Sequence, residues 1–202
     1  MSAKQDIAIV DSGGANIASV KYALERLDSN GELTADPERI KKADKVILPG
    51  VGAAGDAMAR LQRVELLDCL NALGQPVLGI CLGMQLLFEY SEEDDVALLG
   101  LLHGRVKGFA SAATPGPVPH MGWHDVGLDG SGHPLLAGVA DHSYFYFVHS
   151  YYAPVTAAAI GICHYGADFA AIVAQDTIMG CQFHPERSGA PGARLLHNFL
   201  QL

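Results

Sequence analysis

A cysteine between two glycines is the first candidate for chemistry in this sequence. Cys81 is the centre of GICLG at residues 79–83, the thiol counterpart of the G-x-S-x-G pattern, in which a strand turns sharply into a helix. Such a turn presents the central side chain outward, and glycines two positions away relieve the crowding that it creates. The beginning of a helix also favours negative charge, and so the nucleophilic thiolate. Cys81 is therefore a candidate nucleophile, with a small buried cysteine as the alternative interpretation.

A histidine and a carboxylate that could serve this thiol lie near the C-terminus, in FHPE at residues 183–186. Pro185 favours an extended conformation for His184, and side chains two residues apart on an extended segment project to the same side, so Glu186 can reach His184. A carboxylate on one ring nitrogen fixes the tautomer and leaves the other nitrogen to accept the thiol proton. The pattern predicts a triad of nucleophile, base and orienting acid, whereas a lone histidine here would be an ordinary surface residue.

A glycine-rich loop could supply the N–H donors that an oxyanion needs in acyl transfer. Gly50, Val51 and Gly52 follow the apolar run KVILP, at the end of a predicted strand. A phosphate cradle is a competing use of such a loop, but the Lys and Ser/Thr of a P-loop are absent. Taken alone, the loop is weak support for an oxyanion site, because glycine-rich turns before helices are common.

Metal binding is the competing use of the histidines and cysteines. His120 and His124 are four residues apart, in a segment that reads as extended, and the pairs Cys163–His164 and Cys181–His184 match no compact zinc spacing. We therefore expect no metal and no cofactor. Cys69, Cys163 and Cys181 lack the glycine pattern of Cys81, and we expect them to be buried structural thiols.

Composition excludes several classes of protein. The 202 residues predict one domain, 1–202, and an apolar content of 50% is enough for its core. The net charge of −9, with no basic stripe, argues against a nucleic-acid partner, and the acidic run 92–95 reads as a solvated loop. No run approaches the roughly 20 apolar residues of a membrane helix. Without a signal region or a disulfide-like cysteine spacing, the cytoplasm is the expected location.

The first half of the chain alternates short apolar runs with longer amphipathic ones, which is typical of a parallel sheet covered by helices on both faces. The predicted strands are 7–11, 45–49 and 76–80, and the predicted helices are 16–27, 57–73 and 82–90. Ligands bind at the carboxyl ends of the strands in such folds, so Cys81 and the loop 50–52 would lie at the same edge.

The second half predicts antiparallel strands added to this sheet. Strand patterns occupy 101–109, 120–128, 144–152, 158–165, 170–176 and 179–183, and a final helix covers 193–202. The turn-rich stretch 110–119 reads as a loop within the domain, since strand patterns continue on both sides of it. The predicted fold class is α/β, a single open, mostly parallel sheet flanked by helices, with added antiparallel strands.

The segments GICLGMQLLF and FHPERSG resemble the triad-type, class I glutamine amidotransferases. The blocks LPGVGA, VPHMGW, YFVHSYY and LLHNFL narrow the resemblance to the glutaminase subunits of imidazole glycerol phosphate synthases, and the matching blocks run from about residue 46 to the C-terminus. The resemblance implies hydrolysis of glutamine to glutamate and ammonia. The ammonia would pass to a partner (βα)8-barrel cyclase in a heterodimer, which makes imidazole glycerol phosphate and aminoimidazole carboxamide ribotide in histidine biosynthesis.

The resemblance also implies roles for individual residues. It makes Cys81 the nucleophile, His184 the base and Glu186 the orienting acid, with the oxyanion loop at Gly50, Val51 and Gly52. Gln85, one helical turn after Cys81, would contact the substrate, and Ser150 and Tyr151 would hold its backbone. The chain departs from the family pattern in DSGGAN at 11–16, His124 after VPHMGW, and Arg187 after HPE; none of these touches the triad.

Other functions remain open on the sequence alone. The same chemistry could serve a chorismate-using synthase, such as an anthranilate or aminodeoxychorismate synthase. A catalytically inert glutamine-binding scaffold is a second alternative. A thiol peptidase or a glyoxalase-like protein fits the HPE block poorly.

Overall fold

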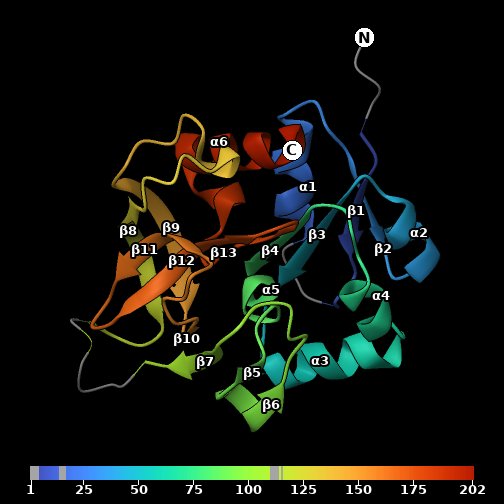
Figure 1. Ribbon diagram of the computed structural model, residues 1–202, viewed down its shortest axis with the longest axis horizontal. Coiled ribbons are helices and arrows are strands. Elements are labelled where there is room, and N and C mark those ends of the chain that lie inside the picture. Colours follow the sequence, from blue (N-terminus) through green and yellow to red (C-terminus); the bar gives the residue numbers. More distant parts are fainter. Residues whose placement is uncertain (1–4, 14–16, 110–113, 115) are drawn as a thin grey trace.

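A nine-stranded mixed sheet forms the centre of the computed structural model, which describes residues 5–13, 17–109, 114 and 116–202 (Figure 1). The strand order is β2-β1-β3-β4-β13-β12-β11-β8-β9. Pairings are parallel from β2 to β13 and antiparallel from β13 to β9. The strands are β1 Ile7–Val10, β2 Gly31–Thr34, β3 Lys45–Gly50, β4 Val77–Cys81, β8 His120–Leu128, β9 Ser143–His149, β11 Ala159–His164, β12 Asp168–Gln175 and β13 Ile178–Cys181.

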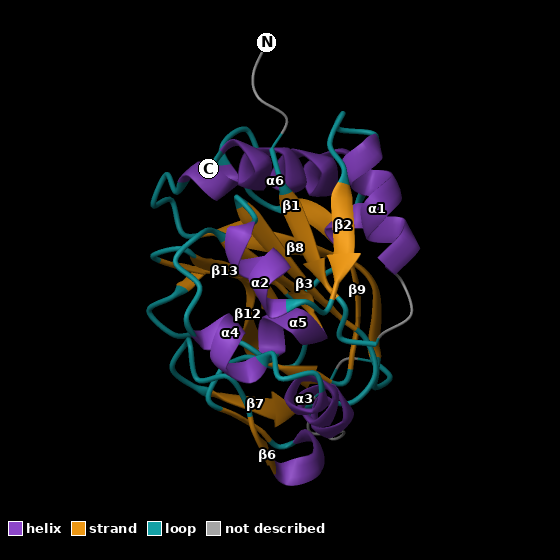
Figure 2. Ribbon diagram, turned by 90° about the vertical axis from the view of Figure 1, so that its right-hand side faces the viewer, coloured by secondary structure: helices purple, strands orange, loops and turns teal. Residues whose placement is uncertain are grey.

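Helices cover both faces of this sheet (Figure 2). One face carries α1 Ile17–Glu25 and α6 Gly189–Gln201, and the other carries α2 Pro37–Lys42, α3 Ala54–Arg63, α4 Leu67–Asn71 and α5 Leu82–Gln85. A small second sheet of β10 Tyr151–Tyr152, β7 Arg105–Gly108, β5 Tyr90–Ser91 and β6 Val96–Ala97 lies on the side of α3 and α5. Short 3-10 turns are η1 Glu93–Asp95, η2 Pro134–Leu136 and η3 Pro185–Arg187. No helix in the described part of the chain is long and apolar enough to cross a membrane.

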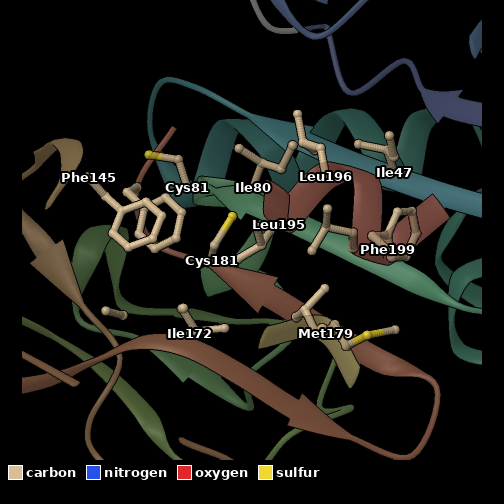
Figure 3. Packing of buried hydrophobic residues seen from close by; sticks show 14 of the residues in the cluster. Ile47, Ile80, Cys81, Phe145, Ile172, Met179, Cys181, Leu195, Leu196 and Phe199 are labelled. Carbon is tan, nitrogen blue, oxygen red and sulfur yellow. The ribbon is translucent and has the colours of Figure 1, made fainter. Parts of the chain in front are cut away.

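Strand side chains alternate between two cores, one on each face of the sheet. On β1, Ile7 and Ile9 join the core under α1 and α6, whereas Ala8 and Val10 join the core under the other helices. Figure 3 shows the first core, in which Ile47 of β3 and Ile80 of β4 lie beside Leu195, Leu196 and Phe199 of α6. Strands that are buried on both faces read as continuous apolar runs, which is why the sequence revealed them.

The α/β architecture confirms the predicted fold class, but several predicted elements were wrong in extent. The helix expected at 57–73 is two helices, because α3 ends in a Schellman-type turn in which the Leu66 N–H bonds to the Leu61 carbonyl. Glu65 holds the left-handed position of this turn, with φ 57°, where glycine is usual, so the sequence carried no stop signal. The start expected at residue 16 lies outside the described residues, as do most of 110–115.

Two further elements are shorter than the sequence predicted. The helix expected at 82–90 ends at Gln85, since the carbonyls of Leu86 and Phe88 accept from the later segment 99–100. The strand expected at 144–152 is interrupted at Ser150, and its two parts belong to different sheets. The pattern at 101–109 yields only β7. The short elements β2, α2, β5 and β6 were not predicted from the sequence.

Candidate active site

Cys81 occupies a strained turn at the junction of β4 and α5. Its backbone has φ 54° and ψ −114°, a conformation that residues other than glycine rarely adopt. Such strained conformations are often found at functional sites. Two close approaches exclude side chains nearby: a Cβ on Gly83 would lie 1.8 Å from the Leu48 carbonyl oxygen, and one on Gly79 would lie 2.6 Å from the Gly83 oxygen. The glycines therefore let β3, β4 and α5 pack closely enough to form this turn.

His184 and Glu186 form a buried pair directly after β13. Nδ1 of His184 lies 2.9 Å from Oε1 of Glu186, and the side chains are 6% and 1% exposed. Glu186 was expected on an extended segment, but it lies in the 3-10 turn η3, which brings the carboxylate back to the ring. This contact at Nδ1 fixes the orientation and the tautomer of the ring. Nε2 is therefore the nitrogen that can exchange a proton with a substrate or with Cys81.

Ser188, which sequence reasoning missed, fixes the backbone of His184. Its hydroxyl donates to the His184 carbonyl at 2.7 Å and accepts from the Tyr146 N–H at 3.0 Å. The His184 N–H in turn donates to the Tyr146 carbonyl at 3.0 Å. These hydrogen bonds hold the backbone of His184 against β9. The end of β9 forms the opposite side of the site.

The surroundings of His184 favour its protonated form when Cys81 is a thiolate. Burial of the ring acts against a positive charge, but hydrogen bonds and charges of Cys81 and Glu186 outweigh it and raise the His184 pKa to about 10. A thiolate–imidazolium pair is the state that attacks an amide and then protonates a leaving amine. The other three cysteines are buried, as predicted, and burial raises the pKa of Cys163 to about 12.

A cavity of about 310 Å³ gathers most of the site residues that the sequence pointed to. Its lining includes Val51, Gly52, Cys81, Gln85, Ser150, Tyr151 and His184. Gly50 does not line it but is paired in register with Cys81 across β3 and β4, and Glu186 lies behind His184. Leu82, Glu93, Pro119, Val148 and His149 complete the lining and were not predicted.

The loop Gly50–Gly52 leads into α3, whose first N–H groups are capped from another segment. Glu93 accepts from the Ala54 N–H at 2.9 Å, and Asp94 accepts from the Gly55 N–H at 3.0 Å. The acidic run 92–95 is largely exposed, as expected, yet it is more than a solvated loop. It fixes the helix that follows the loop, because the N-cap position, Ala53, has no side-chain acceptor of its own.

Two glutamines connect the far wall of the cavity to the sulfur. Nε2 of Gln85 lies 2.8 Å from the Tyr151 carbonyl and 2.9 Å from Oε1 of Gln182, and Nε2 of Gln182 lies 3.8 Å from Cys81 Sγ. Both N–H groups of Gln85 are thus committed within the protein, so Oε1 is the atom that it can offer to a ligand. Gln182, which was not predicted, is fully buried in the run MGCQF, where a single amide among apolar residues is the signal that marks it.

The buried histidines His120 and His149 form a neutral hydrogen-bonded pair. His149 Nδ1 lies 2.7 Å from the Tyr151 carbonyl, and its Nε2 lies 2.9 Å from His120 Nδ1. Burial lowers the pKa of His149 to about 4 and that of His120 to about 3. The ring of His120 stacks against Phe147 and Tyr165. Within the described residues, no group of three or more His, Cys, Asp or Glu side chains is arranged to hold a metal ion.

Comparisons with known proteins agree on one family. The model of the class-I glutamine amidotransferase family matches residues 8–202. The chain is 52% identical over 200 residues to the imidazole glycerol phosphate synthase subunit HisH of Xylella fastidiosa (strain Temecula1), covering 98% of both proteins. It is 48% identical to the subunit HisH of Photorhabdus laumondii, covering 97% of this chain and 99% of the relative.

Solved structures share this fold at low sequence identity. A glutamine amidotransferase crystal structure superposes with a TM-score of 0.74 at 17% identity, covering 96% of this chain and 97% of that chain. The PurLQS structure from Thermotoga maritima gives a TM-score of 0.72 at 18% identity, covering 98% of both chains. A Trypanosoma brucei CTPS glutaminase domain with bound acivicin gives 0.71 at 16% identity, covering 97% of this chain and 92% of that chain.

Proposed function

This chain belongs to the class-I glutamine amidotransferase family, and we propose that Cys81, His184 and Glu186 are the triad with which it hydrolyses glutamine. Relatives about half identical over the full chain are subunits of imidazole glycerol phosphate synthase, so the chain is the glutaminase subunit of such a synthase, in histidine biosynthesis. The observation that carries the triad is a strained cysteine in one cavity with a histidine whose second nitrogen is held by a buried carboxylate.

The proposed reaction begins when the Cys81 thiolate attacks the side-chain amide carbon of glutamine. N–H groups of the loop Gly50–Gly52 stabilise the negative oxygen, and His184 protonates the nitrogen as ammonia leaves. A water molecule, deprotonated by His184, then attacks the thioester and releases glutamate, which restores the Cys81 thiolate and the protonated His184. Glu186 holds the imidazole in the correct orientation in both steps and stabilises its positive charge.

Substrate recognition follows from the groups on the opposite side of the cavity. Oε1 of Gln85 can accept a hydrogen bond from the α-ammonium group of glutamine, because its N–H groups are already used. Ser150, between β9 and β10, and Tyr151, the first residue of β10, line the same cavity, and they would hold the α-carboxylate and backbone of the substrate. The γ-amide then points toward Cys81.

The ammonia requires an acceptor, and a surface beside the cavity fits a protein partner. Met121, Trp123 and Tyr144 are 60%, 52% and 59% exposed and belong to the paired strands β8 and β9. Met121 is opposite Val148, which lines the cavity, so this apolar surface reaches the cavity rim. We propose that a (βα)8-barrel cyclase binds here as a heterodimer and receives the ammonia through a closed passage, which an exposed apolar surface at the exit favours.

A glutamine analogue with an electrophilic carbon in place of the amide tests the triad. It should add one adduct per chain, located on Cys81 by peptide mass spectrometry, and glutamine should protect against it. A site that binds glutamine but is catalytically inert would give no selective adduct. Reaction at another cysteine, or no reaction in the complex with the cyclase, would contradict the assignment.

A second experiment tests the partner surface. Trp123→Ala should weaken binding of the cyclase by tenfold or more, as expected for a buried aromatic anchor. Tyr22→Ala removes an aromatic side chain of similar exposure, 60%, from α1 and should leave binding unchanged. Capture of a chorismate-using enzyme in place of the cyclase would support the alternative acceptor. It would contradict the acceptor inferred from the relatives.

A further inference from the structure

The polarity of the hydrogen bonds around the two buried glutamines is fixed by a single backbone group. The Tyr151 carbonyl can only accept, so Gln85 must present its NH2 group to it. The second N–H of the same Gln85 nitrogen then points at Gln182, which must answer with its oxygen. The NH2 group of Gln182 is consequently the end that faces Cys81 Sγ, at 3.8 Å.

An N–H directed at sulfur has opposite effects on the two forms of Cys81. The thiol form can donate to the Val148 carbonyl, which lies 3.8 Å from Sγ. The thiolate cannot, and the same carbonyl oxygen then repels it. A donor from Gln182 instead stabilises the negative sulfur, because hydrogen bonds to charged groups are stronger than those between neutral groups.

The described titratable groups facing the sulfur come from several elements. Cys181 ends β13, His184 and Glu186 follow it, His149 ends β9, and Tyr151 of β10 and Glu93 of η1 line the same cavity. Unlike His184, Gln182 cannot lose its hydrogens at any working pH. It would therefore support the thiolate both before and after His184 has given up its proton.

We propose that Gln182 is a further catalytic residue of this glutaminase: its amide N–H stabilises the Cys81 thiolate, and Gln85 holds that amide in the required orientation. The inference rests on the proposed role of Cys81 as nucleophile. The hydrogen bond between the two glutamines also links substrate recognition to the nucleophile, because the Gln85 side chain that faces glutamine also orients Gln182.

The test measures the reactivity of the Cys81 sulfur itself. Alkylation of Cys81 by iodoacetamide, followed across pH 5 to 10 by peptide mass spectrometry, gives the rate and midpoint of thiolate formation. Gln182→Met keeps the length of the side chain but has no N–H donor. Relative to the natural chain, it should slow alkylation at pH 7 by about tenfold and raise the midpoint by about one pH unit.

Gln175→Met is the matched control. Gln175 is exposed at the end of β12, paired with Ile178 at the opposite end of β13 from the site. It should titrate as the natural chain does. A folded Gln182→Met protein with an unchanged midpoint would overturn the proposal, whereas a purely structural role would change stability without moving the midpoint.

A measurement on the natural chain covers the case in which Gln182→Met does not fold. The side-chain amide signals of Gln182, followed by nitrogen-15 NMR, should shift with the same midpoint as Cys81 alkylation. In Cys81→Ala that shift should disappear. Signals that stay constant through the titration of Cys81 would overturn the proposal. Since neither readout involves glutamine, failure here is distinct from failure of the glutaminase assignment, which shows in the glutamine-analogue adduct.

Discussion

Nδ1 of His184 lies 2.9 Å from Oε1 of Glu186, with both side chains almost completely buried. In this position the carboxylate orients the ring and stabilises its positive charge, so the proposed mechanism depends on that charge.

Glu186→Gln should therefore lower kcat for glutamine hydrolysis on the order of 10³-fold, with a small effect on KM, because a neutral amide no longer supports the imidazolium. Steady-state kinetics in the complex with the cyclase measures both. Glu25→Gln, at an exposed position on α1, is the control and should have normal kinetics. Normal kcat in Glu186→Gln would remove the carboxylate from the mechanism.

The second prediction concerns the turn at Cys81. Gly83→Ala places a Cβ 1.8 Å from the Leu48 oxygen, so the backbone of β3 or α5 must move. We expect a loss of 4 kcal/mol or more, roughly the upper range for single substitutions, measured by urea unfolding. Gly74→Ala is the matched change, since its Cβ meets nothing within 4 Å and its φ is not positive. Equal stability of the two variants would contradict the close packing described for this turn.

The third prediction is a loss of stability in mild acid. The pKa values of His149 and His120 are lowered to about 4 and 3, so the unfolded chain binds protons from about pH 6.5 downward that the folded chain does not. The free energy of unfolding should fall by about 1.4 kcal/mol per histidine per pH unit below that point, as far as about pH 4. Urea unfolding at pH 7, 6 and 5 measures this slope.

His120→Phe removes one of these two groups while retaining a ring that can stack on Tyr165. The slope between pH 6 and 5 should then fall by about half, even if the variant is less stable at pH 7. An unchanged slope would show that other groups cause the acid sensitivity.

The fourth prediction concerns the acidic segment that caps α3. Glu93→Ala removes the acceptor of the Ala54 N–H and should cost about 1 kcal/mol of stability, the usual effect of losing a helix cap. Because only Ala53 separates the loop Gly50–Gly52 from α3, kcat should also fall. Glu25→Ala removes an equally charged but exposed group and should change neither quantity. An effect of the same size in both variants would mean that net charge, and not capping, is responsible.

The features predicted correctly from the sequence are those that depend on residues close together in the chain. Strands buried on both faces, the glycines around Cys81 and the FHPE segment each carry their signal within a few residues. The break in the helix at 57–73 was invisible because Glu65 holds a left-handed position that normally signals itself through glycine. The role of the acidic segment was equally hidden, since Glu93 caps Ala54 from 39 residues away.

The inner part of the site was harder to predict for the same reason. Gln182 and Gln85 are 97 residues apart and meet only after β13 has paired with β4. Ser188 connects the His184 carbonyl to the Tyr146 N–H of β9, an arrangement that depends on the order of strands in the sheet. Sequence patterns identified which residue types could react, and the fold shows which side chains hold them in place.

Hydrolysis of glutamine at Cys81 is proposed to supply ammonia to the partner subunit. The most direct measurement compares glutamine-dependent and ammonia-dependent synthesis by the complex of Cys81→Ala with the cyclase. We expect the glutamine-dependent reaction to be lost and the ammonia-dependent reaction to continue at the natural rate, because the synthesis of imidazole glycerol phosphate occurs on the partner. Glutamine-dependent synthesis at a normal rate in Cys81→Ala would contradict it.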